Sequence, residues 1–207
     1  MEKIIAFTGS NSPQSINRLL IKHIQQEFPD SGIEYLDLKD YELPIYSLEI
    51  EEKGIPVQAK ELFQTFASAD GYILASPEHN GLPSAFLKNH IDWLSRIDQH
   101  FFGDKPILLL SASPGATGGS SHLGILATLV QRWGGELIGQ FSLGHFHKNF
   151  DISTHKLIKS KDESQLKRLV NELLNHQKMS KENYRSQAEI DALIANTISK
   201  FKGKGFL

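Results

Sequence analysis

The stretch GYILASPEHNGLPSAFLKNHIDWLSR, residues 71–96, decides the fold class of this chain. Residues 71–76 are apolar or small and predict a strand buried on both faces. Residues 77–81 contain Pro, Asn and Gly, which favour a turn. Helical spacing then predicts an amphipathic helix whose buried face carries Leu87, Ile91 and Leu94. A buried strand joined by a turn to such a helix is the repeating unit of an α/β protein.

The same alternation of strand and helix patterns extends along most of the chain. Strands are predicted at 3–9, 33–38, 71–76, 105–113 and 134–143. Because strand–helix–strand connections are right-handed crossovers, this order predicts a parallel sheet with helices on both faces. We expect a doubly wound, flavodoxin-like α/β fold with five parallel strands in the order 2-1-3-4-5.

Two segments lie outside this alternation. Residues 40–57 predict a long loop after the second strand. Residues 176–207 follow the last core stripe and predict a C-terminal helical extension, with apolar residues spaced as on a helix at Ile190, Leu193, Ile194 and Ile198. We therefore expect a core domain at 1–175, and an extension at 176–207 that could contact another chain of an oligomer.

Composition narrows the classes of function. The chain has 207 residues, 40% of them hydrophobic, and a formal net charge of -2 at pH 7, which suits one globular domain and gives no electrostatic reason to expect nucleic acid as a partner. We see neither a membrane span nor a targeting segment, so the cytoplasm is the expected location. The chain has no Cys, which excludes thiol nucleophiles, so redox chemistry would come from a bound cofactor.

Loops that follow parallel strands meet at the carboxyl edge of the sheet, where ligands bind at the reversal of strand order. The first such loop, TGSNSPQSINR at 8–18, is rich in hydroxyl and amide side chains and opens a helix. Its helix N-terminus and the side chains of Ser10, Ser12, Ser15 and Asn17 suit a phosphate. The same residues equally suit ordinary helix capping, and this loop alone does not decide between the two.

The second and third loops have equally unusual compositions. In the second, PEHNG brings Glu78, His79 and Asn80 to the same edge, and the following helix offers Asp92 and Arg96 as an i,i+4 pair. The third, SASPGATGGSS at 111–121, has glycines and hydroxyl groups that allow backbone amides to approach a planar or anionic ligand closely, or else form a flexible loop with a capped helix start.

At these three loops the chain resembles the NADPH-dependent FMN reductase family of flavodoxin-like flavoproteins. The resemblance is carried, in order, by Gly9-Ser10 with Ser15 and Asn17, by Pro77–Gly81 leading to Leu87–Arg96, and by Ser111–Gly119. It spans residues 3–175 with the order and spacing of the three motifs kept. The middle motif is long and specific, whereas the other two would be weak alone.

The resemblance implies where FMN binds. The first loop would hold its phosphate, residues 77–80 would border the ribityl chain and one edge of the ring, and the third loop would lie along the ring. The implied cofactor-binding residues are Ser10, Ser12, Ser15, Ile16, Asn17, Pro77, Glu78, His79, Asn80, Gly81, Ser113, Pro114, Gly115, Gly118 and Gly119. No catalytic side chain is implied, because the cofactor carries the hydride chemistry.

The implied activity is that of an FMN-dependent NAD(P)H oxidoreductase. NADPH or NADH would reduce FMN, and a quinone, azo compound, free flavin or similar small molecule would then enter the same cleft in a ping-pong cycle. A homodimer or homotetramer is implied as well. A flavin-binding electron carrier or sensor without turnover of its own stays open, since fold alone does not exclude it.

Two departures from the family pattern, and one further motif, complete the sequence evidence. The family often has an Arg near the position of Ser12, which this chain lacks there. The family's usual residue after Pro-Glu is Tyr, and here it is His79, whose type of side chain can carry charge near neutral pH. His145 and His147 form an H-x-H pair. No third ligand is evident nearby, so we expect a surface or cleft-rim pair rather than a metal site.

Overall fold

The computed structural model describes residues 3–180 and 187–202, without the side chains of 177–180, 187–188 and 197–202. Its main sheet has five strands, all parallel, in the order β2-β1-β3-β6-β7. The strands are β1 (Ile4–Thr8), β2 (Ile33–Leu36), β3 (Gly71–Ala75), β6 (Lys105–Ala112) and β7 (Gly135–Leu143). Since β6 and β7 are the fourth and fifth strands of this sheet in the sequence, the predicted order is confirmed.

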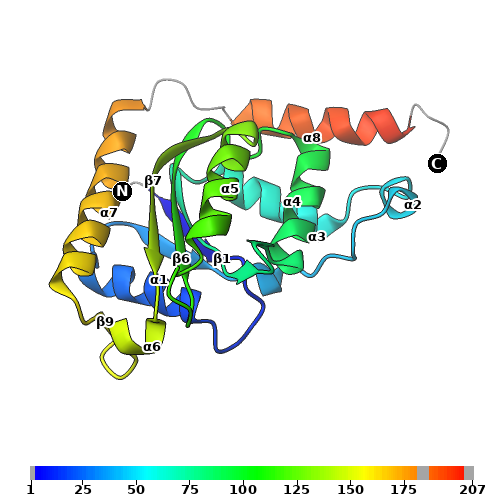
Figure 1. Ribbon diagram of the computed structural model, residues 1–207. Helices are drawn as coiled ribbons and strands as arrows, with labels where there is room; N and C mark the ends of the chain where they lie inside the picture. Colours follow the sequence, from blue (N-terminus) through cyan, green and yellow to red (C-terminus); the bar gives the residue numbers. More distant parts are fainter. Residues whose placement is uncertain (1–2, 181–186, 203–207) are drawn as a thin grey trace.

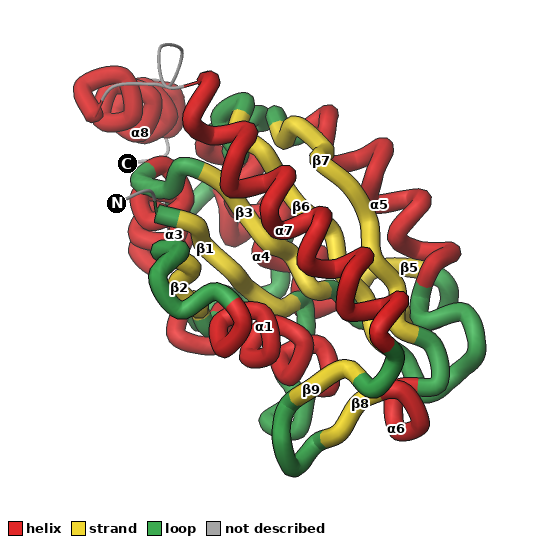
Figure 2. The backbone as a smooth tube through the Cα atoms, turned by 90° about the vertical axis from the view of Figure 1, so that its left-hand side faces the viewer, coloured by secondary structure: helices red, strands yellow, loops and turns green. Residues whose placement is uncertain are grey.

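Helices cover both faces of the sheet (Figures 1 and 2). One face is covered by α1 (Ile16–Glu27) and α7 (Ser160–Ser180). The other is covered by α3 (Val57–Ala67), α4 (Ala85–Ile97) and α5 (Ser120–Arg132). Strand β1 shows how the sheet divides the interior, because Ile4 and Ala6 face the first layer while Ile5 and Phe7 face the second. The predicted two-sided α/β fold is therefore confirmed.

Helix α4 forms where the opening stretch predicts it. Ser84 is its N-cap and accepts a hydrogen bond from the Leu87 amide at 3.0 Å. The predicted pairing along this helix is wrong in one respect. Asp92 pairs with Lys88 at 2.6 Å, one turn earlier, while the guanidinium of Arg96 lies 5.4 Å from the centre of the Tyr46 ring. Arg96 is therefore held by an aromatic ring that the local pattern did not include.

The segment 40–57 is more ordered than the long loop that the sequence predicts. A 3-10 turn, η1 (Leu38–Asp40), ends at the first residue of this segment, and a short helix, α2 (Leu48–Glu51), lies within it. Helix α3, which the sequence analysis did not identify, begins at the last residue of the segment. Asn89 accepts a hydrogen bond from the Tyr46 amide at 2.8 Å, and the Trp93 indole donates to the Pro44 carbonyl at 2.8 Å. Helix α4 thus fixes the segment 40–57, which we call the arm, to the body of the protein.

The C-terminal region contains α8 (Gln187–Lys202), which lies against α3 and α4 (Figure 1). Ile190 is buried in the same core cluster as residues of α3 and α4, and Ile194 packs against that cluster. Part of the predicted apolar stripe is therefore covered within the same chain. Helix α7 continues past the predicted domain boundary at residue 175.

The remaining elements are short. They are the pair β4 (Glu78–His79) and β5 (Leu82–Pro83), helix α6 (Phe146–Asn149), and the pair β8 (Phe150–Asp151) and β9 (Lys156–Leu157). Within the residues that the structure describes, no helix is both long and apolar enough to cross a membrane.

Candidate functional site

The three loops singled out in the sequence begin side by side at the carboxyl edge of the sheet. They follow β1, β3 and β6, which are neighbours in the sheet. The Gly9 amide donates to the Ala75 carbonyl at 3.1 Å, and the Ser76 amide donates to the Leu110 carbonyl at 2.8 Å. The strand ladders thus continue into the loops and bring residues far apart in the sequence to one place.

The first loop combines an exposed part with a buried tie. Its tip, at Ser12, is exposed, and Ser15 is the N-cap of α1, where its hydroxyl accepts from the Arg18 amide. Asn17 is buried, and its side-chain amide is bonded twice to Ala112 at the end of β6, as acceptor at 2.9 Å and as donor at 3.3 Å. Asn17 therefore joins the first loop to the strand that leads into the third loop.

The second loop is a β-hairpin. Strands β4 and β5 pair antiparallel, and the two residues between them, Asn80 and Gly81, have positive φ values of 53° and 79°. An Asn-Gly pair with both residues in this region forms the type I′ turn favoured in two-residue hairpins. The Ser84 hydroxyl at the start of α4 donates to the Gly9 carbonyl, which ties the segment after the hairpin to the first loop.

The third loop packs directly against the backbone that follows β7. The Ser113 amide donates to the Leu143 carbonyl at 3.2 Å, and the His145 amide donates to the Gly115 carbonyl at 2.8 Å. Gly118 has a φ of +63°, and a Cβ on it would lie 2.5 Å from the Gly144 nitrogen. Backbone therefore approaches backbone so closely here that only glycine fits.

A residue that the sequence analysis missed connects the second and third loops. The ring of His122, at the start of α5, is fully buried, and its Nδ1 lies 2.8 Å from the Gly119 carbonyl oxygen. The Glu78 carboxylate lies 3.4 Å from the His122 amide nitrogen and 3.7 Å from Nδ1. Burial lowers the pKa of the His122 imidazole, although Gly119 and Glu78 act in the opposite direction. A His three residues after Gly-Gly at a predicted helix start was the signal available.

The predicted site residues divide into three groups by exposure. Those exposed at the surface of the loops are Ser12, His79, Asn80, Pro114 and Gly115. Those partly buried are Ser10, Ile16, Pro77, Glu78, Gly81 and Ser113. Those buried are Ser15, Asn17, Gly118 and Gly119. The first two groups are available to a ligand, whereas the buried group forms the frame that holds the loops.

The residues present fit FMN. The exposed edge offers hydroxyl groups and the N-terminus of the twelve-residue helix α1, which suit a phosphate, next to a glycine-containing loop that suits a flat ring. The family's Arg near Ser12 is absent here, and Arg18, the first Arg after Ser12 in the sequence, has other partners. Its guanidinium lies 3.5 Å from the Asp37 carboxylate and stacks 4.6 Å from the centre of the Tyr35 ring.

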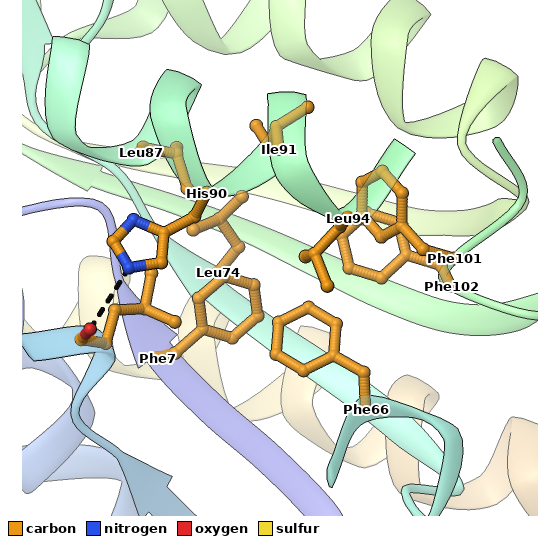
Figure 3. Close-up of a pocket in the computed structure, with 10 residues that line it drawn as sticks. Phe7, Phe66, Leu74, Leu87, His90, Ile91, Leu94, Phe101 and Phe102 are labelled. Carbon is orange, nitrogen blue, oxygen red and sulfur yellow. Dashed lines mark hydrogen bonds between the residues drawn. The ribbon is translucent and has the colours of Figure 1, made fainter. Parts of the chain in front are cut away.

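An interior cavity lies near the site but does not suit a ligand. It has a volume of about 10 Å³ and is lined mainly by aliphatic and aromatic side chains, including Phe7, Leu74 and Leu87 (Figure 3). His90 stands at its margin, with Nε2 3.1 Å from the Leu38 carbonyl oxygen. A space of this size is at the lower limit for a single water molecule, so it belongs to the packing of α4 on the sheet.

The H-x-H pair lies close to the third loop. His145 has a φ of +48° and precedes α6, and His147 lies within that helix, so the chain is not extended here. Both side chains are exposed. In the described part of the chain, no group of three or more His, Asp or Glu side chains could hold a metal ion.

The order of the strands in the sheet, and the carboxyl edge at which the three loops meet, define a flavodoxin-like α/β protein with a candidate flavin site. A family model described as NADPH-dependent FMN reductase matches residues 2–148, and the chain belongs to this family of FMN-dependent NAD(P)H oxidoreductases.

The chain is also similar to individual proteins and to solved structures. The chain is 30% identical over 148 residues to an uncharacterised protein of Mycoplasma pneumoniae, covering 69% of this chain and 87% of that one. It is 28% identical over 167 residues to a quinone reductase of Escherichia coli, covering 69% and 88%. Among solved structures, the flavoenzyme NAD(P)H:(acceptor) oxidoreductase FerB from Paracoccus denitrificans matches with a TM-score of 0.71 at 20% identity, covering 86% of this chain and 98% of that one. At this identity the structural match supports the fold alone.

Proposed function

We propose that this chain holds one FMN on its three loops and uses it to pass electrons from NADPH or NADH to a quinone, an azo compound, a free flavin or a similar small acceptor. Donor and acceptor would use the same cleft in turn, in a ping-pong cycle. The observation that carries the proposal is the meeting of three family motifs at one edge of the sheet, joined by the bonds from Asn17 and Ser84. The E. coli relative is named a quinone reductase, which favours quinones among the acceptors.

Bound FMN would supply the redox chemistry by accepting a hydride and releasing electrons. The protein residues would bind and orient it. Ser10 and Ser12 would donate hydrogen bonds to the phosphate at the start of α1, where the helix dipole also favours negative charge. The exposed backbone of Pro114 and Gly115 would lie along the ring and exclude water from one side of it. No side chain needs to move a proton for the hydride step.

The test begins with the purified protein. We expect a yellow protein that releases FMN on denaturation, and loses its visible flavin absorbance rapidly when mixed with NADPH without oxygen. Release of FAD, or no binding after reconstitution with FMN, would refute the cofactor assignment. If NADPH and NADH both reduce the bound FMN much more slowly than related enzymes turn over their acceptors, the result would favour an electron carrier instead.

Steady-state rates test the order of binding. If donor and acceptor use one cleft in turn, double-reciprocal plots at several fixed quinone concentrations should be parallel. Intersecting lines would mean that both are bound together, which the ping-pong proposal does not allow.

The proposal includes a homodimer or homotetramer. The arm at 40–57 carries large apolar side chains that are far from buried, with Ile45 at 84%, Leu48 at 60% and Val57 at 61% exposure. Such groups on an arm anchored by α4 suit contact with another copy of the chain. Light scattering on the eluting protein should give at least twice the mass of one chain, and a monomer at micromolar concentration would refute this part.

A further inference from the structure

Helix α5 starts without a cap of its own. Its N-cap residue is Gly119, with a φ of +81° and no side chain to accept hydrogen bonds from the first turn. None of the first-turn residues of α5, all of which the structure describes, is acidic. A methyl group on Gly119 would collide with the Ser111 hydroxyl oxygen. Packing therefore requires glycine at the position where helices usually carry Ser, Thr, Asn or Asp.

The missing cap comes from the neighbouring hairpin. The Glu78 carboxylate is within 3.4 Å of the amide of His122, the third residue of α5. A side-chain oxygen at the N-cap accepts from this same third amide in an ordinary capped helix. The negative charge of Glu78 also lies at the positive end of the helix dipole. The second loop thus supplies both the acceptor and the charge that the third loop lacks.

The side chain of His122 lies beneath this contact. Its Nδ1 is directed to the Gly119 carbonyl, so the other ring nitrogen carries the lone pair in the neutral form, which burial favours. That nitrogen, Nε2, and the Ser111 hydroxyl oxygen are both buried without a hydrogen-bond partner among the described residues. Unpaired buried polar groups cost free energy, and Glu78 bonds neither of these two, since its contacts are with the His122 amide and Nδ1.

We propose that Glu78 and His122 are positioning residues, and that the Glu78 carboxylate caps α5 from the hairpin and so fixes the second loop against the third. The inference rests on the proposed function, because the two loops would then hold FMN between fixed edges. It gives Glu78 a role in the frame of the site, in place of the direct cofactor contact that the family resemblance implies.

The first test uses the protein without cofactor. Glu78→Ala removes the cap, whereas Glu78→Gln keeps an acceptor oxygen and removes only the charge. Hydrogen exchange of the first-turn amides of α5 should be at least tenfold faster in Glu78→Ala, and close to the parent rate in Glu78→Gln. The charged groups acting on the His122 ring are Glu78 and, with opposite effect, His79. Because Glu78 raises the pKa of His122, the titration midpoint of the His122 ring, followed by NMR, should fall in both variants.

The second test measures FMN affinity by quenching of flavin fluorescence. We expect the Kd to rise about tenfold in Glu78→Ala and less than threefold in Glu78→Gln, because the amide oxygen retains most of the positioning. Glu172→Gln, on the exposed surface of α7, is the matched control, since it removes the same charge from an i,i+4 pair with Arg168. It should change neither exchange, titration nor affinity.

The outcomes separate this inference from the proposed function. If the parent protein binds no FMN, the proposed function fails, while exchange and titration still judge the contact. If exchange at α5 and the His122 titration are unchanged in Glu78→Ala, the positioning role is wrong whatever the FMN affinity. Should Glu78→Ala not fold, Glu78→Gln decides alone, because an unchanged His122 midpoint in that variant overturns the contact.

Discussion

A single methyl group on Gly118 tests the close packing of the third loop. In Gly118→Ala the new Cβ would lie 2.5 Å from the Gly144 nitrogen, 2.6 Å from the Leu143 carbonyl carbon and 2.8 Å from the Leu143 nitrogen. All three atoms are backbone, so no side chain can rotate away. The φ of +63° adds backbone strain for any residue with a Cβ.

The expected loss in free energy of unfolding follows from these two causes, the close contacts and the backbone strain. Left-handed backbone costs a residue with a Cβ about 1–2 kcal/mol. Forcing an extra methyl into packed surroundings costs about 1–3 kcal/mol. Together they should lower the free energy of unfolding by about 2–5 kcal/mol, and the melting temperature by about 4–20 °C for a chain of this length.

Gly115→Ala is the matched control in the same loop. Gly115 does not have positive φ, and a Cβ there would be 3.6 Å from the Ser113 hydroxyl oxygen, an ordinary contact. Any Gly→Ala change also reduces the entropy of the unfolded chain, which stabilises by about 0.4–1 kcal/mol. This gain is common to both variants, so the difference between them isolates strain and overpacking.

The assay is urea denaturation of both variants without cofactor, followed by circular dichroism. We expect Gly115→Ala to equal or slightly exceed the parent in stability and Gly118→Ala to fall well below it. If the two variants unfold within about 0.5 kcal/mol of each other, which is the size of an ordinary surface effect, the loop does not lie against the chain after β7 as described.

Three further predictions address the first loop and pH. Asn17→Ala leaves both backbone groups of Ala112 unpaired and should lower the free energy of unfolding by about 2–4 kcal/mol in the same assay, whereas a loss below about 1 kcal/mol would mean that water replaces the tie. Ser12→Arg restores the family's cation and should tighten FMN binding about tenfold, because hydrogen bonds to charged groups contribute about 1.5–3 kcal/mol; an unchanged Kd by fluorescence quenching would place the phosphate elsewhere. The pKa of Asp151 is lowered from 3.8 to about 2 by hydrogen bonds from its own hairpin, first from the Ser153 hydroxyl. Because the pKa of Asp151 is lower in the folded than in the unfolded protein, its ionised carboxylate stabilises the fold. This contribution is complete above pH 3.8 and is lost as pH falls toward 2. NMR spectra of the parent protein should show a transition of Asp151 in this pH range, and those of Asp151→Asn should lack it.

The fold could be predicted from sequence because its signals are local and repeated. The strands at 71–76 and 105–113 are runs of mainly apolar residues that end at small residues, and strand and helix patterns alternate along most of the chain. Helix α3 was missed because its start lacks two usual signals: its N-cap, Pro56, makes no side-chain hydrogen bond, and its first turn, all of which is described, carries no acidic residue. The hairpin at β4 and β5 was missed although Asn80-Gly81 is the strongest short hairpin signal, because the β-type runs beside it are only two residues long.

The frame of the site could not be predicted, because its contacts join distant parts of the chain. The bond from Asn17 to Ala112 crosses 95 positions, and the contact from Glu78 to His122 crosses 44. A local pattern can show that an Asn or a Glu stands in a loop, but not which backbone group it will satisfy. The distinction matters for function, because a family motif contains both residues that touch a ligand and residues that hold the loops. In the first loop exposure separates the two kinds, since Ser12 and Asn17 belong to the same motif region while one is exposed and the other is bonded inside the protein.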